Sequence, residues 1–298
     1  MRLFFSLMFT SILMITSIKI KAEDLTLSTW NTEWLTVNSN HKIDEAKRKP
    51  EDFSALKSYF HKLDADLIAF QEVDNQAAFK QISSSNYNIL LSDRNLPQNR
   101  NHQFPDINQF TGFAIRNNVP YSDPIDIDLY GKANHKLRFA AYVILYPESP
   151  TPIHALSIHL KAGCMGKFYS NKTACQTLLE QGENLNQWIK RRESQRDEYV
   201  IMGDFNHNLS YGGDWLWKEI TQGIKQTPKL ATRDTQAECK VPKRNNSKQL
   251  HQFRSVIDHI IVSSNLNVSN AKQAVYDEQD VVNYRLSDHC PITAQLKW

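Results

Sequence analysis

Short runs of apolar or alternating residues recur from one end of the chain to the other, and this recurrence restricts the chain to folds rich in strands. Nine such runs lie at residues 25–30, 66–73, 87–93, 110–117, 137–146, 153–160, 199–206, 255–263 and 291–298. Runs of this length are typical of β-strands. The sequence therefore predicts strands distributed over the whole chain.

Helical spacing stands out in two places between these runs. Apolar residues recur every three or four positions after Pro50, a proline suited to a first helical turn: Phe53, Leu56, Phe60 and Leu63. A second amphipathic pattern ends in a basic cluster and contains Leu178, Leu185, Trp188 and Ile189. Many strands with a few helices predict an α/β fold in which two packed sheets are flanked by helices.

The start of the chain differs from the rest. An apolar run from Leu3 to Ile18 follows a basic residue, and Ala22 precedes an acidic pair. This pattern predicts a secretory signal peptide, residues 1–22, cleaved after its last residue. An uncleaved membrane anchor fits less well, because the run is short for a span and contains Ser and Thr. Residues 23–298 show no repeat or linker and are predicted to form a single domain.

Removal of that segment changes the charge balance. The whole chain has 35 Lys and Arg against 32 Asp and Glu, and the segment holds three basic residues and no acidic one. The mature protein would be formally neutral, so its net charge does not indicate a polyanionic partner. Two basic clusters remain, as solvated faces or as contacts to a phosphate backbone: Lys190, Arg191, Arg192 and Arg196, and Lys240, Lys243, Arg244 and Lys248.

Four cysteines in a chain that is predicted to be exported indicate disulfide bonds. Three pairings of Cys164, Cys175, Cys239 and Cys290 can be drawn. The short loop between the first two favours Cys164–Cys175, which leaves Cys239–Cys290. A zinc site is the alternative, but no CxxC pair or histidine at a matching spacing supports it.

Polar residues that can carry chemistry recur at the ends of the predicted strands. They are Asn31 and Glu33, Glu72, His159, Asp204 and Asn206, Asp258, and the pair Asp288 and His289. Strands that share a sheet can bring their ends together, so these residues are expected to meet in one cleft.

The types of these residues indicate water attack on a phosphorus centre. Glu33, Glu72, Asp204 and Asp288 are hard oxygen ligands of the kind that Mg²⁺ and Mn²⁺ prefer. The imidazoles can move protons or bind a phosphoryl oxygen, and the Asp258 carboxylate is a candidate to orient one of them. The amides can donate to developing negative charge. No Ser or Cys nucleophile is needed for such a reaction.

The order of residues in GDFN at 203–206 has two interpretations. If the strand continues that far, Asp204 and Asn206 share one face and Phe205 points into a core. An Asx turn at the end of the strand accounts for the same residues equally well.

Six motifs together are more specific than any one of them: WNTE at 30–33, QEV at 71–73, IHLKAG at 158–163, GDFN at 203–206, ID at 257–258 and SDHCPI at 287–292. Their order and spacing resemble those of the endonuclease/exonuclease/phosphatase superfamily over essentially the whole mature chain. The resemblance implies a four-layer α/β/β/α sandwich with two mostly antiparallel sheets, as in deoxyribonuclease I. It also implies divalent-metal-dependent hydrolysis of a phosphoester.

The resemblance assigns a role to each candidate residue. Glu72 resembles the principal metal ligand, with Glu33 and Asp288 as further carboxylates of the metal site. His289, paired with Asp258, resembles the general base. The remaining residues would hold the phosphate or orient the water, and His159 would donate to a phosphoryl oxygen or to the leaving group: Asn31, Arg138, His159, Asp204 and Asn206. Which imidazole is base and which is acid stays open at this point.

The context of His159 in IHLKAG, followed by Cys175, resembles secreted bacterial endonuclease-like members. The leading hypothesis is a secreted or periplasmic Mg²⁺-dependent nuclease, with Mn²⁺ or Ca²⁺ as alternative ions, that cuts DNA; RNA is a further candidate substrate. The alternative is a phosphodiesterase or phosphatase on phospholipid head groups, like a sphingomyelinase, or on inositol phosphates. A monomer without stable membrane association is expected. The histidines outside the motifs, including His207, are predicted to be surface or core residues.

Overall fold

The computed structural model describes residues 24–38, 42–243 and 246–298. The predicted signal peptide at residues 1–22 lies outside the described residues and stays a prediction. In the part of the chain that is described, no helix is both long and apolar enough to cross a membrane.

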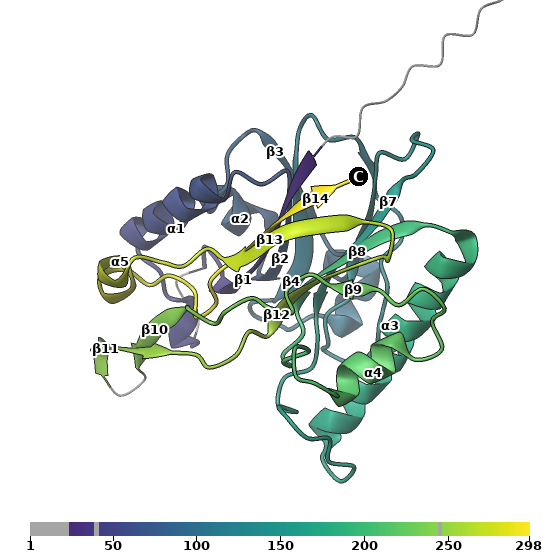
Figure 1. Cartoon of the computed structure of the whole chain (residues 1–298). Coiled ribbons are helices and arrows are strands. Elements are labelled where there is room, and N and C mark those ends of the chain that lie inside the picture. Colours follow the sequence, from purple (N-terminus) through teal and green to yellow (C-terminus); the bar gives the residue numbers. More distant parts are fainter. Residues whose placement is uncertain (1–23, 39–41, 244–245) are drawn as a thin grey trace, which may run out of the picture.

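Two six-stranded sheets form the centre of the molecule (Figure 1). The first has the order β13-β14-β1-β2-β4-β3, with β1 Asp24–Leu35, β2 Leu67–Val73, β3 Tyr87–Leu91, β4 Phe110–Arg116, β13 Asn267–Gln273 and β14 Ile292–Lys297. The second has the order β5-β6-β7-β8-β12-β9, with β5 Tyr121–Ser122, β6 Ala141–Leu145, β7 Ile153–His159, β8 Glu198–Asp204, β9 Lys229–Leu230 and β12 Asp258–Val262. Only β1 with β2 and β7 with β8 pair in parallel among these described strands.

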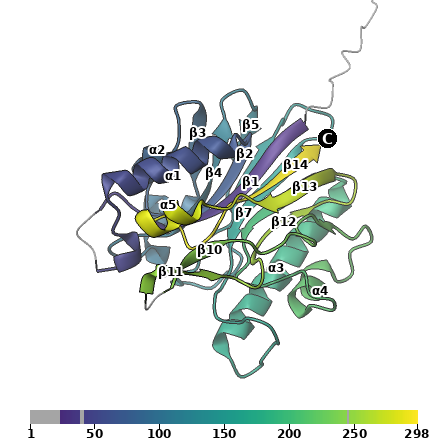
Figure 2. The same ribbon diagram turned by 60° about the vertical axis from the view of Figure 1, so that its left-hand side comes forward.

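Helices cover the outer face of each sheet (Figure 2). The first sheet packs against α1 Pro50–Leu63, α2 Gln76–Ile82 and α5 Glu278–Asn283. The second packs against α3 Thr173–Gln195 and α4 Trp215–Thr221. A hairpin of β10 Lys240–Lys243 and β11 Asn246–Gln252 and short 3₁₀ helices at Asp44–Ala46, Asp93–Asn95 and Pro97–His102 lie in the connections. The predicted four-layer α/β/β/α sandwich is confirmed.

Each of the nine predicted runs overlaps one strand, and both predicted helices are present. The sequence reading missed β5, β9, β13, the β10–β11 hairpin and the helices α2, α4 and α5. Most of these elements are too short to show a period. The edge strand β13 is longer but mostly polar, because an edge strand needs no continuous apolar face. They leave the layered architecture unchanged.

The alternation of residues in the central strands separates three apolar layers. Leu27 of β1, Ala69 of β2, Ala155 of β7 and Met202 of β8 point into the space between the sheets. The intervening positions of the first sheet pack under α1 and α2, and those of the second sheet under α3 and α4. Because strand side chains alternate with period two, residues two positions beyond these core residues also face the space between the sheets. That geometry determines where the polar strand ends meet.

Candidate active site

At one end of the second sheet, three neighbouring strands each carry a polar side chain that faces the space between the sheets. His159 ends β7, Asp204 ends β8 and Asp258 begins β12; the sheet register pairs Asp204 with both of the others. All three are buried. The Oδ2 atom of Asp204 lies 3.5 Å from His159 Nε2 and 3.9 Å from the Nε2 of His289. Asp204 is therefore held between two imidazoles.

Two residues of the first sheet complete this group. Asn31 Nδ2 donates to Asp204 Oδ2 at 3.0 Å and to Glu72 Oε1 at 3.2 Å, which bridges the two sheets. Alternation alone would turn Glu72 outward, on the face of Phe70. Glu72 has a φ of +61°, beside a register shift between β2 and β4, and its carboxylate instead reaches Asn31 and approaches His159. A bulge thus re-aims the carboxylate toward the cleft.

The GDFN segment is a turn and not an extension of the strand. β8 ends at Asp204, and Asn206 has a φ of +51°. Asp204 Oδ1 accepts from the Asn206 backbone N–H at 2.7 Å, and Asn206 Nδ2 donates to Asp204 Oδ2 at 3.2 Å. The first of the two interpretations, a shared strand face, is therefore wrong, and the Asx turn is present. Phe205 is fully buried under α3 and α4, as predicted.

Gly203 is required in this segment by close packing. It has a φ of +148°, and a Cβ atom there would lie 2.0 Å from the carbonyl oxygen of Ile158 on β7. A side chain would push β7 and β8 apart and separate His159 from Asp204.

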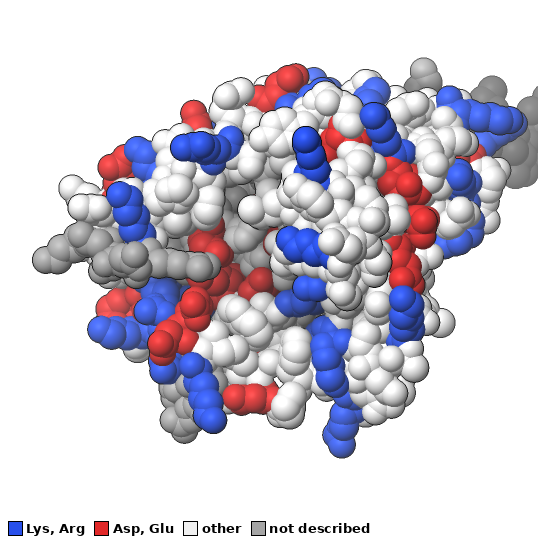
Figure 3. Space-filling view, turned by 90° about the horizontal axis from the view of Figure 1, so that it is seen from below, with Lys and Arg blue, Asp and Glu red and all other residues white. Residues whose placement is uncertain are grey.

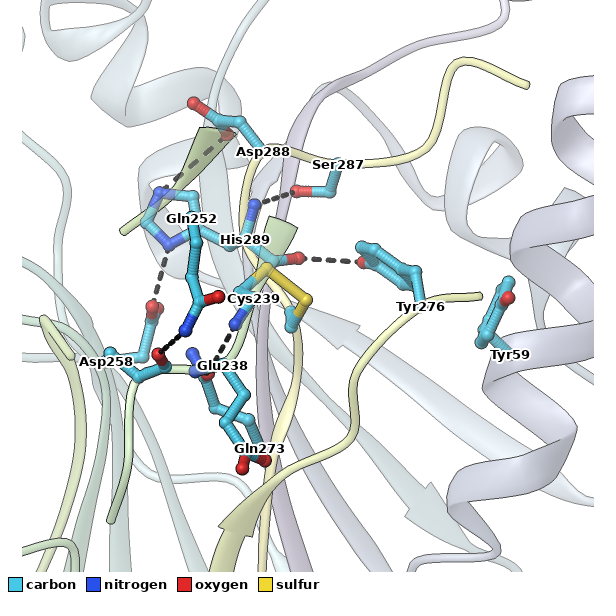
Figure 4. The surroundings of a disulfide bond; sticks show 12 residues. Tyr59, Glu238, Cys239, Gln252, Asp258, Gln273, Tyr276, Ser287, Asp288 and His289 are labelled. Carbon is cyan, nitrogen blue, oxygen red and sulfur yellow. Dashed lines mark hydrogen bonds and ion pairs between the residues drawn. A yellow bond between two sulfur atoms is a disulfide. The ribbon is translucent and has the colours of Figure 1, made fainter. Parts of the chain in front are cut away.

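The segment that contains His289 is braced on several sides (Figure 4). Ser287 Oγ donates to the carbonyl of Asn31 at 2.7 Å and accepts from the His289 backbone N–H at 3.0 Å. Tyr276 donates its hydroxyl to the His289 carbonyl at 2.7 Å. The Cys239–Cys290 disulfide joins Cys290, which follows His289, to the residue that precedes β10. The Cys164–Cys175 disulfide closes the loop after β7. Both pairings are those that the short loop favoured.

The two imidazoles have opposite electrostatic surroundings. Burial lowers the pKa of His159 well below its ordinary value, and the nearby Arg138 charge lowers it further. Burial also opposes protonation of His289, but the charges of Asp258 and Asp204 outweigh burial and raise the pKa of His289 well above its ordinary value. His289 Nδ1 lies 2.7 Å from Asp258 Oδ2. His159 is thus held neutral, whereas His289 has a high proton affinity.

Negative charge accumulates at the site. Burial raises the pKa of Asp204 to about 7; the Asp258 charge acts in the same direction and the His289 charge against it. Burial and the charge of Asp288 raise the pKa of Glu33 to about 8. Glu33 Oε2 also accepts from the Asp288 backbone N–H at 3.1 Å. Figure 3 shows the result: acidic side chains lie inside a hollow whose margin carries Lys and Arg.

Three buried polar atoms at this hollow have no hydrogen-bond partner among the described residues, which is the arrangement expected around a ligand. They are His159 Nδ1, Arg138 Nε and Asp258 Oδ1. Asp204, Asp258 and His289 offer ligand atoms within 4.8 Å of one another, and Glu72 adds a further carboxylate, joined to Asp204 through the Asn31 amide N–H groups. Unpaired donors fit a phosphate, and crowded carboxylates fit a divalent cation. The residues present therefore fit both groups.

Some predicted features lie elsewhere. The Lys190–Arg196 cluster is in the last turns of α3, about 25 Å along the helix from the end next to β7, so it does not flank the site. His207 is a buried structural residue, with its Nε2 2.7 Å from Asp214 and its Nδ1 2.9 Å from the Cys164 carbonyl. In the other cluster, the side chains of Arg244 and Lys248 lie outside the described part of the chain.

Sequence reasoning missed the residues that position the site. Arg48 donates to the carbonyls of Thr32 and Leu286 at 3.0 and 2.8 Å, so it joins the end of β1 to the segment before His289. Ser287 lies within a recognised motif, which is a signal that could have identified it. Arg48 lies in an ordinary basic stretch, KRKP, and only its tertiary contacts single it out.

Carboxylates, amides and two imidazoles at one end of two packed sheets form the set of groups used by the endonuclease/exonuclease/phosphatase superfamily, whose members are hydrolases of phosphoester bonds. The sequence profile of the Endonuclease/Exonuclease/phosphatase family matches residues 28–289, and the chain belongs to this family. No curated protein matches the chain in sequence.

Solved structures share the fold at low sequence identity. TDP2 from C. elegans superposes with a TM-score of 0.62 and 13% identity, over 92% of this chain and 75% of that one. An endonuclease/exonuclease/phosphatase from Bacteroides vulgatus gives 0.61 and 14%, over 92% and 99%. A mannosyl-6-phosphatase from Bacteroides thetaiotaomicron gives 0.57 and 13%, over 92% and 100%. These likenesses establish the fold.

Proposed function

We propose that this protein is an exported, Mg²⁺-dependent nuclease that hydrolyses phosphodiester bonds of DNA and also of RNA. One observation supports it above the others: the buried Asp204 carboxylate lies between a neutral His159 and an Asp258-bound His289. Two differently poised imidazoles around one oxygen-rich hollow suit hydrolysis, in which one group takes the proton of the water and a neutral imidazole can donate a hydrogen bond to the phosphoryl group.

In this proposal each side chain has a defined task. His289, oriented by Asp258, takes the proton of the attacking water at Nε2. Asp204 and Asn206 hold that water and the phosphate in line. Arg138 and Asn31 donate to the non-bridging oxygens as negative charge builds. His159 donates to a phosphoryl oxygen or to the leaving group.

The metal would be held by Glu72, with the carboxylates of Glu33 and Asp288 next to it. When bound, the cation would neutralise carboxylate and phosphate charge and so lower the proton affinity of His289 toward neutral pH. Mn²⁺ or Ca²⁺ are the alternative ions for this oxygen-rich set.

The substrate assignment is tested by incubating the protein, without residues 1–22, with plasmid DNA, RNA, sphingomyelin vesicles, inositol phosphates and a sugar phosphate, each with Mg²⁺ or EDTA. We expect cleavage of DNA and RNA in Mg²⁺ alone. Turnover of only the vesicles, inositol phosphates or sugar phosphate would overturn the nuclease assignment in favour of a lipid phosphodiesterase or a phosphatase.

The site assignment is tested with variants of the residues around Asp204. His289→Ala and Asp204→Ala should each lower kcat about 100- to 10,000-fold, the range of general acid–base catalysis. His61→Ala on the outer surface of α1 is the matched control and should retain the wild-type rate. Near-normal rates for His289→Ala would contradict its role.

Export is part of the same proposal. It is supported by the apolar N-terminal segment and by two disulfides, which form in oxidising compartments. Sequencing the N-terminus of the exported protein should give Glu23 as its first residue. A protein that retains residues 1–22 would contradict signal-peptide cleavage.

A further inference from the structure

The loop between β7 and α3, residues 161–172, exposes large apolar side chains although its backbone is fixed. Met165, Phe168 and Tyr169 are 74%, 36% and 54% exposed. The Cys164–Cys175 disulfide closes the loop. We call this segment the aromatic loop. Its exposed side chains are costly in water unless they serve a contact.

Contacts with helix α4 and with the GDFN segment fix the aromatic loop beside the site. Trp215 of α4 donates its indole N–H to the Gly166 carbonyl at 2.9 Å, and its ring centroid lies 5.1 Å from that of Phe168. On the site side, the Leu160 backbone N–H donates to the Asp204 carbonyl at 2.9 Å. Asn206 Nδ2 donates to the Leu160 carbonyl at 3.1 Å. The aromatic loop therefore begins directly beside Asp204.

Charge on the aromatic loop has one sign. Residues 161–179 contain Lys161, Lys167 and Lys172 and no Asp or Glu. Lys161 lies close enough to His159 to act, with burial as the larger effect, in lowering the pKa of that imidazole. The positive end of the α3 dipole is at the same place, and the first turn of α3 carries no acid. A polyanionic strand bound in the site would therefore meet positive charge where it extends past the site onto the aromatic loop.

We propose that the aromatic loop binds unpaired nucleotides next to the scissile phosphate, so that the enzyme prefers single-stranded nucleic acid to a duplex. The inference rests on the proposed nuclease function. Phe168 and Tyr169 present ring faces on which bases can stack, and the lysines contact the flanking phosphates. Bases of an intact duplex are stacked on one another and do not offer their faces.

A membrane surface fits the same loop less well. Insertion needs a contiguous apolar face, whereas Gly166 and Lys167 separate Met165 from Phe168, and polar residues follow Tyr169. Two adjacent rings between Lys167 and Lys172 suit instead the bases and flanking phosphates of a single strand.

Binding is tested by fluorescence anisotropy with a labelled oligothymidylate and a blunt duplex, in a His289→Ala background that prevents cleavage. Phe168→Ala with Tyr169→Ala should weaken single-strand binding about tenfold or more and leave duplex binding almost unchanged. Lys167→Gln with Lys172→Gln should reduce the salt dependence of single-strand binding by a slope of about 1.4. Val282→Ala, a 43% exposed apolar residue of the distant helix α5, is the matched control.

Cleavage gives the second readout. The ratio of single-strand to duplex cleavage should fall about tenfold in the Phe168, Tyr169 double variant, with the melting temperature and the Cys164–Cys175 bond retained. An unchanged ratio, or an equal loss on both substrates, would overturn the inference and leave the nuclease function intact. Loss of binding to phosphatidylserine vesicles without loss of oligonucleotide binding would also overturn it. A protein that binds the oligonucleotide through the loop but cleaves no nucleic acid would contradict only the nuclease function.

Discussion

At the scale of single residues, neighbours decide what each histidine does. His159 and His289 contact the same Asp204 oxygen, yet burial holds the first neutral and the carboxylates around the second favour its charged form. His207 is buried beside the same motif but carries no role in the cleft. Both of its ring nitrogens face acceptors, the Asp214 carboxylate and the Cys164 carbonyl. Its charge therefore stabilises the fold.

The stability contributed by His207 should depend on pH. Burial opposes its charge, but the hydrogen bonds to Asp214 and Cys164 outweigh burial and raise its pKa above the ordinary 6.5. Because the pKa of His207 is higher in the folded state than in the unfolded state, its protonation stabilises the fold. This contribution is complete below about pH 6.5 and is lost as the pH rises through the folded-state pKa. We expect the difference in unfolding free energy between wild type and His207→Gln to be largest at pH 6 and to shrink by pH 9.

Urea unfolding at several pH values measures this difference. The exposed His61→Gln is the control and should show no such trend. A difference that grows with pH would contradict a charged His207.

At the scale of elements, the site depends on how the end of β1 is joined to the segment before β14. Glu33 and Trp34 have positive φ values, so β1 bends away after Asn31. Arg48 donates to carbonyls of both segments: Thr32 and Trp34 on one side, and Arg285 and Leu286 on the other. Its Nη2 atom also lies 4.0 Å from Glu33 Oε2. These hydrogen bonds make Arg48 a positioning residue for Asn31 and His289.

Replacement of Arg48 should therefore damage turnover more than substrate binding. Arg48→Met leaves buried carbonyls unpaired, which costs about 1–3 kcal/mol for each group. We expect kcat to fall about tenfold or more with KM little changed, because small displacements of catalytic groups are costly, and we expect Arg48→Lys to recover part of the loss.

Steady-state kinetics on a phosphodiester substrate measure the effect. Arg116→Ala is the matched control. It also removes an arginine that is bound to other residues, here Asp64 and Asp66, but at the ends of β2 and β4 that lie away from the site. It should lower the melting temperature and leave kcat unchanged. Equal losses of kcat in both variants would show that Arg48 acts only through stability.

At the scale of the whole molecule, the two sheets bring acidic strand ends from distant parts of the chain into one hollow. Glu33, Glu72, Asp204 and Asp288 come from both sheets and from the segment before β14. Burial is the main cause that raises the pKa of Asp204 to about 7 and that of Glu33 to about 8. The charge of Asp258 adds to the shift at Asp204, and the charges of Asp288 and Glu72 add to it at Glu33, so ionised carboxylates here repel one another. A divalent cation would offset this repulsion.

Mg²⁺ should therefore stabilise the metal-free protein. A ligand at 100 times its dissociation constant adds about 2.7 kcal/mol to the free energy of unfolding, which raises the melting temperature by several degrees, roughly 5 to 10 °C. Differential scanning fluorimetry after EDTA treatment measures the shift. Glu72→Gln should abolish it and the exposed Glu148→Gln should retain it. An undiminished shift in Glu72→Gln would contradict its place as metal ligand.

The layers could be predicted from the sequence because each buried central strand consists of apolar or alternating residues, which form a local pattern. The nine runs, the Pro50 helix and the helix of Leu178 to Ile189 depend on local periodicity, and the disulfide pairing on loop length. β13 and β9 carried no such signal, because an edge strand is half solvated or too short to show a period. The GDFN segment was ambiguous for a related reason: an Asx turn and a strand end use the same residues.

What the sequence determined by itself is the set of chemical groups: which carboxylates, amides and imidazoles end the strands, and that these strands build two sheets. What only the tertiary structure decided is their orientation and charge. Glu72 faces the cleft through a backbone bulge, His159 and His289 differ through burial and neighbours, and Arg48 holds two segments more than 200 residues apart in sequence. These properties depend on contacts between residues distant in sequence, which local patterns do not contain.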